Sequence, residues 1–159
     1  MSRRHRLRQA DPDDKSFLAC LFAATRADLL APVGLPQDRL APLLAMQWQA
    51  QRAGYAADHP AAVDSVIEVG QERIGRVLVE WRTAEVHLVD IAVLPGRTGE
   101  GIGSAVIDDL LEQARSRDCV LVLSVARDNL RAVALYRRLG FVEDGGRPAS
   151  PAHLAMRHA

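Results

Sequence analysis

The spacing of apolar residues in the first third of the chain predicts one strand followed by two helices. Residues 4–9 are expected to form the first strand. Asp11-Pro12-Asp13 is typical of a helix start, because it combines a capping side chain, a proline in the first turn and acidic residues at the positive helix end. This helix should run to about Ala27 and bury Phe17, Leu18, Leu21 and Phe22.

The stretch 29–36 is apolar but rich in Pro and Gly, so it should interrupt regular structure, either packed on the core or lining a pocket. A second helix is expected over about 37–52. The amphipathic side chains near its end either contact a substrate or pack with their polar tips in water: Gln47, Trp48, Gln51 and Tyr55.

From Ser65 onward the apolar period becomes that of strands. Val66–Val69 and 74–81 predict a hairpin, because a Gly-containing turn separates them. The later elements are expected as a strand over 86–94, a helix over 103–116, a buried parallel strand over 119–125, a helix over 129–139 and closing strands near 141–143 and 154–157. The resulting order, β-α-α-β-β-β-α-β-α-β-β, belongs to the α+β class with a mixed sheet.

The composition fits one domain over residues 1–159, since 48% of the residues are hydrophobic. A formal net charge of zero gives no general attraction to nucleic acid or membranes, and Arg3, Arg4, Arg6 and Arg8 are read as the charged face of an edge strand. The longest apolar run, Phe17–Ala24, is shorter than a membrane span, and no signal peptide follows the arginines, so a cytoplasmic protein is expected. Cys20 and Cys119 are expected as buried, reduced residues, and no structural metal is expected.

Three alternating glycines mark the segment with the clearest chemical meaning. Pro95-Gly96 ends the apolar strand, and Gly99, Gly101 and Gly103 then stand directly before a helix. Glycine lets a ligand approach the backbone, and the first N–H groups of a helix have no partner within the helix. This segment is therefore expected to bind an anion, most naturally phosphate.

Two familiar phosphate motifs fit this loop poorly. A P-loop requires Gly-Lys-Ser/Thr, but the single lysine of the chain is Lys15. A dinucleotide fold requires Gly-x-Gly-x-x-Gly, and Ser104 stands where the third glycine belongs.

Thr98-Gly-Glu-Gly101-Ile-Gly103 instead resembles the acetyl-CoA loop of the GNAT superfamily of N-acetyltransferases, Gln/Arg-x-x-Gly-x-Gly/Ala. Thr98 departs from that pattern, and Arg97 is its neighbour. About thirty residues downstream, Asn129-Leu-Arg-Ala-Val-Ala-Leu-Tyr136-Arg-Arg-Leu-Gly-Phe141 resembles the second segment of the family, Asn-x-x-Ala-x-x-Leu-Tyr-x-x-x-Gly-Phe. The two motifs together cover roughly the second half of the chain.

The resemblance implies a GNAT-like fold with a mixed, largely antiparallel sheet of about seven strands and about four helices. It also implies acetyl transfer from acetyl-CoA, as co-substrate and without a metal, to a primary amine by direct transfer. The backbone of Ile91 and Val93 would pair with the pantetheine arm, and the Asn129 side chain would bond it. The phosphates would lie on the loop residues Thr98, Gly99, Glu100, Gly101, Ile102, Gly103 and Ser104.

Tyr136 occupies the place of the acid that protonates the departing thiolate in the family. His87 is the first candidate for the base that deprotonates the amine, with Asp90, Glu80 and water as alternatives. Ser124 stands where some ribosomal-protein acetyltransferases carry a glutamate, which argues against that subclass.

Two other functions stay open from the sequence. One is an acetyl-CoA sensor without transfer, for which Thr98 is the only support; the other is a dinucleotide-binding oxidoreductase. The acceptor, a small-molecule or peptide amine, is not identified by the sequence, and neither is the oligomeric state, for which a homodimer is one possibility.

Overall fold

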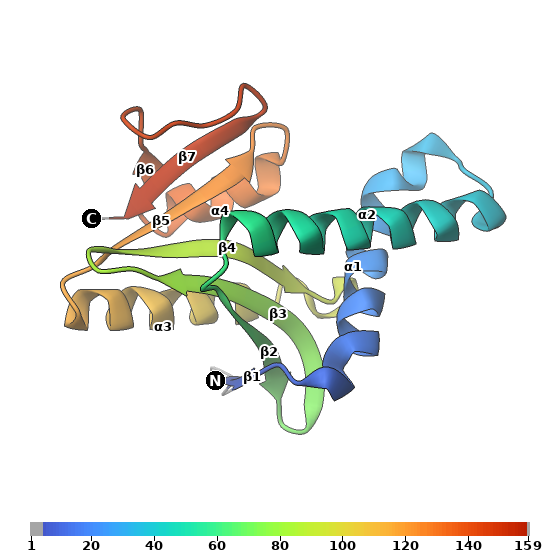
Figure 1. The fold of residues 1–159 in the computed structure, drawn as a ribbon, viewed down its shortest axis with the longest axis horizontal. Coiled ribbons are helices and arrows are strands. Elements are labelled where there is room, and N and C mark those ends of the chain that lie inside the picture. Colours follow the sequence, from blue (N-terminus) through green and yellow to red (C-terminus); the bar gives the residue numbers. More distant parts are fainter. Residues whose placement is uncertain (1–4, 159) are drawn as a thin grey trace.

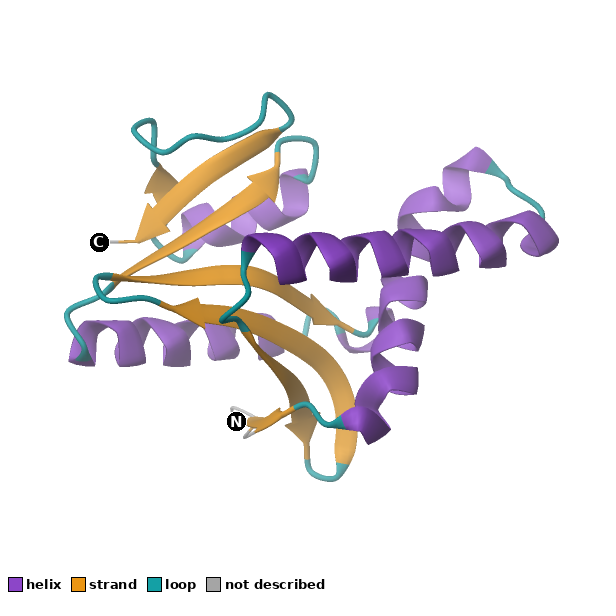
Figure 2. Cartoon of the chain, in the orientation of Figure 1, coloured by secondary structure: helices purple, strands orange, loops and turns teal. Residues whose placement is uncertain are grey.

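The computed structural model describes residues 5–158, which form one seven-stranded sheet in the order β1-β2-β3-β4-β5-β7-β6 (Figures 1 and 2). Among these strands only β4 and β5 pair in parallel. The strands are β1 His5–Gln9, β2 Val63–Val69, β3 Glu72–Trp81, β4 Glu85–Val93, β5 Val120–Ala126, β6 Val142–Glu143 and β7 His153–His158. The helices are α1 Lys15–Leu30, α2 Gln37–Asp58, α3 Ile102–Ser116 and α4 Leu130–Arg138, with short 3-10 turns at Pro12–Asp14, Ala31–Val33 and Pro95–Arg97. The predicted order of elements is confirmed.

The helices bury two separate sets of apolar residues. Those of α3 and α4 join the sheet in the main core, which includes Ile107, Val133 and Met156. Helix α3 has the 3.6-residue period that such packing requires, and its residues Val106, Ile107, Leu110, Leu111 and Ala114 are all buried. Helices α1 and α2 meet in a smaller cluster around Leu18, Phe22 and Trp48.

The opening in the sheet that shapes the site comes from the divergence of β4 and β5. They pair only from Glu85–Leu88 to Val120–Leu123. Beyond that point, β4 continues with β3 and β5 continues with β7, so the two strands separate (Figure 1). A β-bulge contributes to this bend, because Leu78 pairs with Asp90 while Val79 pairs with Leu88, which leaves Val89 as an extra residue.

This divergence leaves backbone groups of β4 without a neighbouring strand. The N–H of Leu94 donates to the carbonyl of Ile74, so the alternate residues Asp90, Ala92 and Leu94 direct their backbone groups toward β3. Ile91 and Val93 therefore direct theirs toward the opening, where an extended ligand could pair with them.

Both N-terminal helices run further than the sequence predicted. Helix α1 continues to Leu30 and into a 3-10 turn that Gly34 ends at a φ of +71°, so most of the expected break is helical. Helix α2 extends to Asp58 because the residues after Arg52 include three alanines, which favour helix. It stops where His59 precedes Pro60, since a residue before proline avoids the helical conformation.

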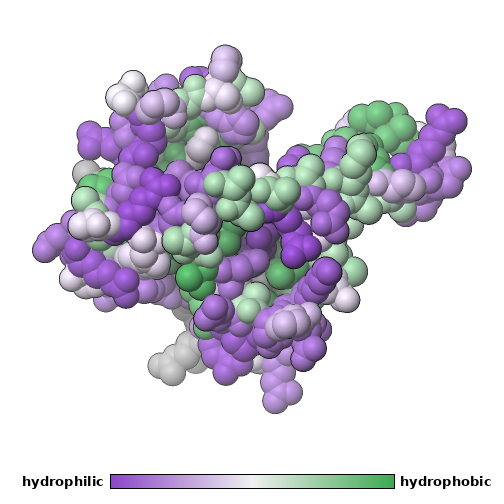
Figure 3. Space-filling model, in the orientation of Figure 1, coloured by the Kyte–Doolittle hydropathy of each residue, from purple (hydrophilic) through white to green (hydrophobic). Residues whose placement is uncertain are grey.

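The ends of α1 and α2 form an arm that projects from the body and carries exposed apolar side chains (Figures 1 and 3). Leu29 is 66% exposed, Val33 63% and Met46 65%. By length and composition the helical segment Pro12–Val33 could cross a membrane, although its longest uninterrupted apolar run is the expected Phe17–Ala24. Its other face packs inward through Leu18, Leu21 and Phe22.

The expectations for the cysteines and the basic start have different outcomes. Cys20 is exposed, contrary to the prediction, because the helical period turns its neighbours Leu18 and Phe22 inward and Cys20 away. Cys119 is only partly buried. Arg6 and Arg8 lie on the edge strand β1 and pair with Glu68 of β2, as the edge-strand interpretation expects; Arg3 and Arg4 lie outside the described residues.

Candidate active site

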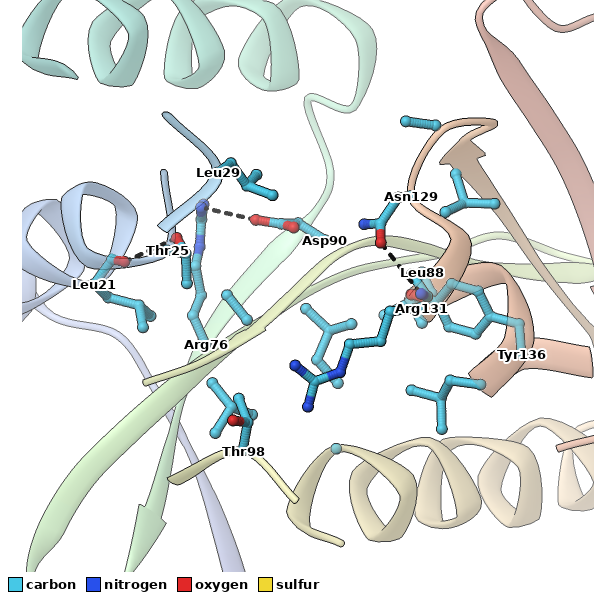
Figure 4. A pocket seen from close by; sticks show the side chains of 18 of the residues that line it. Leu21, Thr25, Leu29, Arg76, Leu88, Asp90, Thr98, Asn129, Arg131 and Tyr136 are labelled. Carbon is cyan, nitrogen blue, oxygen red and sulfur yellow. Dashed lines mark hydrogen bonds and ion pairs between the residues drawn. The ribbon is translucent and has the colours of Figure 1, made fainter. Parts of the chain in front are cut away.

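A cavity of about 1280 Å³ lies where β4 and β5 separate (Figure 4). Its walls come from α1 and α2 on one side, and from the glycine loop and α4 on the other. Most of the predicted cofactor-binding residues line it: Ile91, Val93, Thr98, Gly99, Gly101, Ile102, Gly103, Ser104, Asn129 and Tyr136. Glu100 and His87 are not among its lining residues. The volume exceeds that of a pocket for a single drug-sized ligand, which suits one long ligand and a second small one.

The glycine loop is open to this cavity. Gly99 and Gly101 have φ values of +82° and +78°, in the left-handed region that favours glycine. A Cβ atom at Gly99, Gly101 or Gly103 would have no neighbour within 4 Å, so a ligand can approach the backbone. Gly101 caps α3 without any side-chain hydrogen bond, and the positive end of this 15-residue helix thus faces the cavity. The geometry fits the phosphate site that the sequence predicts.

The side chains at the start of the loop are committed to the protein itself. The Thr98 hydroxyl donates to the carbonyl of Pro95 at 2.8 Å. The guanidinium of Arg97, the neighbour of Thr98, pairs with both Glu72 and Glu100. The charge of Arg97 is therefore neutralised locally, and the loop offers a ligand mainly its backbone.

Arg131 supplies a positive charge to the side of the cavity formed by the glycine loop and α4. The sequence did not lead us to expect this residue in the site. Its side chain extends from α4 into the cavity toward Thr98 (Figure 4). It has no ion-pair partner within residues 5–158. The sequence feature that could have identified Arg131 is its position two residues after Asn129, inside the second motif.

Asn129 begins α4 and uses its side-chain oxygen there. Asn129 Oδ1 accepts the backbone N–H of Ala132 at 3.2 Å (Figure 4), a helix cap. The NH₂ group of the side chain is then left to donate to a ligand, as the predicted pantetheine contact requires.

Tyr136 lies on the same helix with its ring in the core. It is 8% exposed and packs edge-on against Phe141 at a centroid distance of 5.6 Å, yet it also lines the cavity. Burial, with a smaller contribution from the charge of Asp90, raises the pKa of Tyr136 to about 12. Its hydroxyl therefore stays protonated at neutral pH, as a proton donor must.

Asp90 is the candidate base that the structure brings into the cavity. Its carboxylate lies 3.4 Å from Nη1 of Arg76 (Figure 4). Nε of Arg76 also donates to Oδ1 of Asp64 at 2.8 Å. Burial raises the pKa of Asp90 above its ordinary value, while Arg76 opposes that rise. Asp90 therefore accepts a proton more readily than an ordinary aspartate.

The structure does not bring His87 into the cavity. Its ring lies against that of His59 at 4.6 Å, near the end of α2, and its Nδ1 is buried without a hydrogen-bond partner. Burial, and then the nearby His59, lower the pKa of His87 to about 4, so it is neutral at pH 7. Glu80, another of the sequence candidates, is paired with Arg82 and His59 and does not line the cavity either. Ser124 does line it, at the end of β5.

The fold, the glycine loop and the second motif together place this chain in a known class. The model of the Acetyltransferase (GNAT) family matches residues 33–141, which is more than half of the chain. The chain therefore belongs to the GNAT acetyltransferase family.

Individual relatives agree with this assignment. Mycothiol acetyltransferase of Frankia casuarinae is 36% identical over 139 residues, which cover 83% of this chain and 39% of that protein. Thialysine N-epsilon-acetyltransferase of Bos taurus is 41% identical over 61 residues, 38% of this chain and 36% of the relative. The chain thus spans less than two fifths of the length of these curated relatives. The paiA N-acetyltransferase of Thermoplasma acidophilum, solved with coenzyme A, shares the fold at a TM-score of 0.73 and 12% identity, with 98% of both chains covered.

Proposed function

We propose that this protein transfers an acetyl group from acetyl-CoA to an amine. The observation that carries the proposal is one cavity lined by the glycine loop, by the free edge of β4 at Ile91 and Val93, and by Tyr136. The membership of the GNAT family and the CoA bound to the Thermoplasma neighbour support it. The name of the bovine relative, an N-epsilon-acetyltransferase, supports an amine as acceptor.

The residues divide the binding of acetyl-CoA between them. The backbone N–H groups of 99–104 hold the pyrophosphate, and Arg131 adds a charge opposite it. The exposed backbone of Ile91 and Val93 pairs with the pantetheine arm, and the NH₂ of Asn129 donates to it. When bound, acetyl-CoA supplies an activated thioester, so the protein contributes mainly position and polarisation.

Two side chains handle protons. Asp90 accepts the proton of the ammonium group, which frees the nitrogen lone pair for bond formation with the acetyl carbon. As the carbon–sulfur bond breaks, the Tyr136 hydroxyl donates to the thiolate sulfur. The nitrogen, now bonded to the acetyl carbon, loses its second proton, which restores the Tyr136 hydroxyl by way of water, and Asp90 releases its proton to solvent. The acetyl group ends on nitrogen, and the products are an amide and CoA with a free thiol.

Binding and turnover together test the proposal. Isothermal titration with acetyl-CoA and with NAD should show binding of acetyl-CoA alone, and a panel of primary amines should release CoA thiol. Binding of acetyl-CoA without transfer to any amine would instead favour the sensor. Binding of NAD would favour the oxidoreductase, although the largely antiparallel sheet is not that of a dinucleotide fold.

A further inference from the structure

The α1–α2 half of the cavity differs from the cofactor half in its side chains. It is walled by apolar and aromatic groups, among them Phe22, Trp48 and Tyr55, and by the cations Arg26 and Arg76. Leu29 lines it and is 66% exposed, so this half is accessible to solvent. This half therefore offers an acceptor an entrance on the side of the cavity away from the glycine loop.

The charged side chains of the α1–α2 half differ in whether they already have ion-pair partners. Asp90 of β4 is already paired with Arg76, and the other carboxylate that lines the cavity, Asp128, stands directly before Asn129 at the start of α4. Arg76 is 6% exposed and also bonds Asp64, so two carboxylates neutralise its single charge. A polycation would therefore find no unpaired carboxylate on the walls that α1, α2 and β4 supply.

Arg26 is the cation that remains available. Within residues 5–158 it has no carboxylate within ion-pair distance, and its guanidinium lies over the ring of Phe22 at 5.4 Å. It is close enough to act electrostatically on both Asp90 and Tyr55. A guanidinium held on an aromatic ring beside a cavity is well suited to a planar carboxylate, which it can bind through two hydrogen bonds.

We propose that the acceptor is a small amine that also carries a carboxylate, with the carboxylate on Arg26 and the amine directed toward Asp90. This inference rests on the proposed function, because it assigns the second substrate of the same cavity. Trp48 and Tyr55 would cover the carbon chain between the two charged ends.

Matched amine pairs test this selectivity, because each pair differs chiefly in the carboxylate. The pairs are lysine and cadaverine, 4-aminobutyrate and propylamine, and alanine and alaninamide. The carboxylate member should be preferred by about tenfold or more in kcat/KM in at least one pair, as for one charge-assisted hydrogen-bonded contact. Arg26→Gln should reduce that ratio to within about twofold.

Arg52→Gln is the matched control. Arg52 lies on α2 with its guanidinium 5.5 Å from the Trp48 ring, but it does not line the cavity. This variant should keep the ratio of the parent protein. A ratio near one in every pair, or equal loss in both variants, would overturn the inference.

Titration of the same pairs into the protein–CoA complex separates this inference from the proposed function. Preferential binding of carboxylate members without turnover would support the selectivity and contradict acetyl transfer. Turnover without preference would support transfer and contradict the selectivity. If no member of any pair binds or reacts, the carboxylate assignment is wrong.

Discussion

Burial acts on both side chains to which we assign proton transfers, Tyr136 and Asp90. Burial raises the pKa of both groups, to about 12 for Tyr136 and above the ordinary value for Asp90. The carboxylate is thereby made a stronger base, whereas the phenol, which is protonated at neutral pH with or without the shift, becomes a weaker acid. Burial therefore favours the base that we propose, whereas the acid that we propose depends on the position of its hydroxyl at the thiolate sulfur.

Tyr136→Phe should lower kcat by about a hundredfold, the lower end of what a general acid contributes. CoA thiolate leaves more easily than an amine would, which is why the lower end is expected. The ring remains against Phe141, so acetyl-CoA affinity and the melting temperature should change little. Near-parental turnover, with chemistry shown to be rate-limiting, would leave Tyr136 as a packing residue.

Asp90→Asn tests the base. Protonation of Asp90 should reduce the parental kcat/KM as the pH falls, and because its pKa is raised, this loss should begin at a higher pH than for an ordinary aspartate. The variant should lose about 10²-fold or more in kcat at neutral pH. Its kcat/KM should still rise with pH, but only because more of the acceptor amine is unprotonated in solution.

His87→Gln is the control for the pH dependence of kcat/KM in Asp90→Asn. His87 lies outside the cavity, so its loss should leave the pH dependence of kcat/KM unchanged. If His87→Gln abolishes turnover while Asp90→Asn does not, the assignment of the base must be reversed.

At the scale of elements, the proposed phosphate site combines the backbone of the glycine loop with the side chain of Arg131 from α4. Gly101→Val should weaken acetyl-CoA binding at least tenfold, because the side chain would occupy the space that the phosphates need. Valine is also strained at a φ of +78°, so the variant should lose stability as well.

Gly70→Val separates these two effects. Gly70 has a φ of +63° and equally open surroundings, but it lies in the β2–β3 turn and not in the cavity. It should lower the melting temperature without changing the Kd of acetyl-CoA. Equal Kd values for both variants, measured by titration calorimetry, would show that the loop is not the phosphate site.

Arg131→Gln should weaken acetyl-CoA binding by about tenfold and reduce its dependence on salt, because a phosphate contact is lost. Arg137, on the same helix but not lining the cavity, provides the control through Arg137→Gln. Fluorescence or calorimetric titrations at two salt concentrations give both quantities. An unchanged Kd for Arg131→Gln would place its side chain outside the cofactor contacts.

The elements themselves were largely predictable, since periodicity and turn residues are local properties. The period of α3 and the apolar run of β5 identified both correctly. The lengths of α1 and α2 were underestimated, because Pro and Gly were read as breaks where a 3-10 turn and a helix accommodate them. Motif spacing indicated Asn129 and Tyr136, but it could not show that Asn129 also caps α4.

The choice among candidate bases depends on the whole sheet and was not predictable. His87 and Asp90 are three residues apart on β4, and the bulge at Val89 shifts the alternation of side chains between them. Whether either residue meets the cofactor then depends on where β5 leaves β4, which is a contact between distant parts of the chain. No local pattern in the sequence predicts the residue at which β5 separates from β4.

At the scale of the whole molecule, one buried carboxylate joins the N-terminal segment to the sheet. Asp14, which is 1% exposed, accepts from Arg8 of β1, from Arg73 of β3 and from the backbone N–H of Asp11. Helix α1, which supplies one wall of the cavity, begins directly after it. The position of that wall therefore depends on this cluster.

Asp14→Asn should reduce the free energy of unfolding by about 2 kcal/mol at pH 7, because it removes the charge of a buried carboxylate that the partly exposed Arg8 and Arg73 share. The Arg8 bond and the Asp11 N–H hold the pKa of Asp14 well below its ordinary value of 3.8. A lowered pKa stabilises the fold above the unfolded pKa, and that contribution is lost as the pH falls below it. Urea unfolding should therefore show a difference between parent and variant that is constant from pH 7 to 5 and smaller at pH 3.

Asp13→Asn, an exposed neighbour in the same turn, should have little effect. A difference that does not change with pH would mean that the charge of Asp14 contributes nothing, and that its role is one of shape alone.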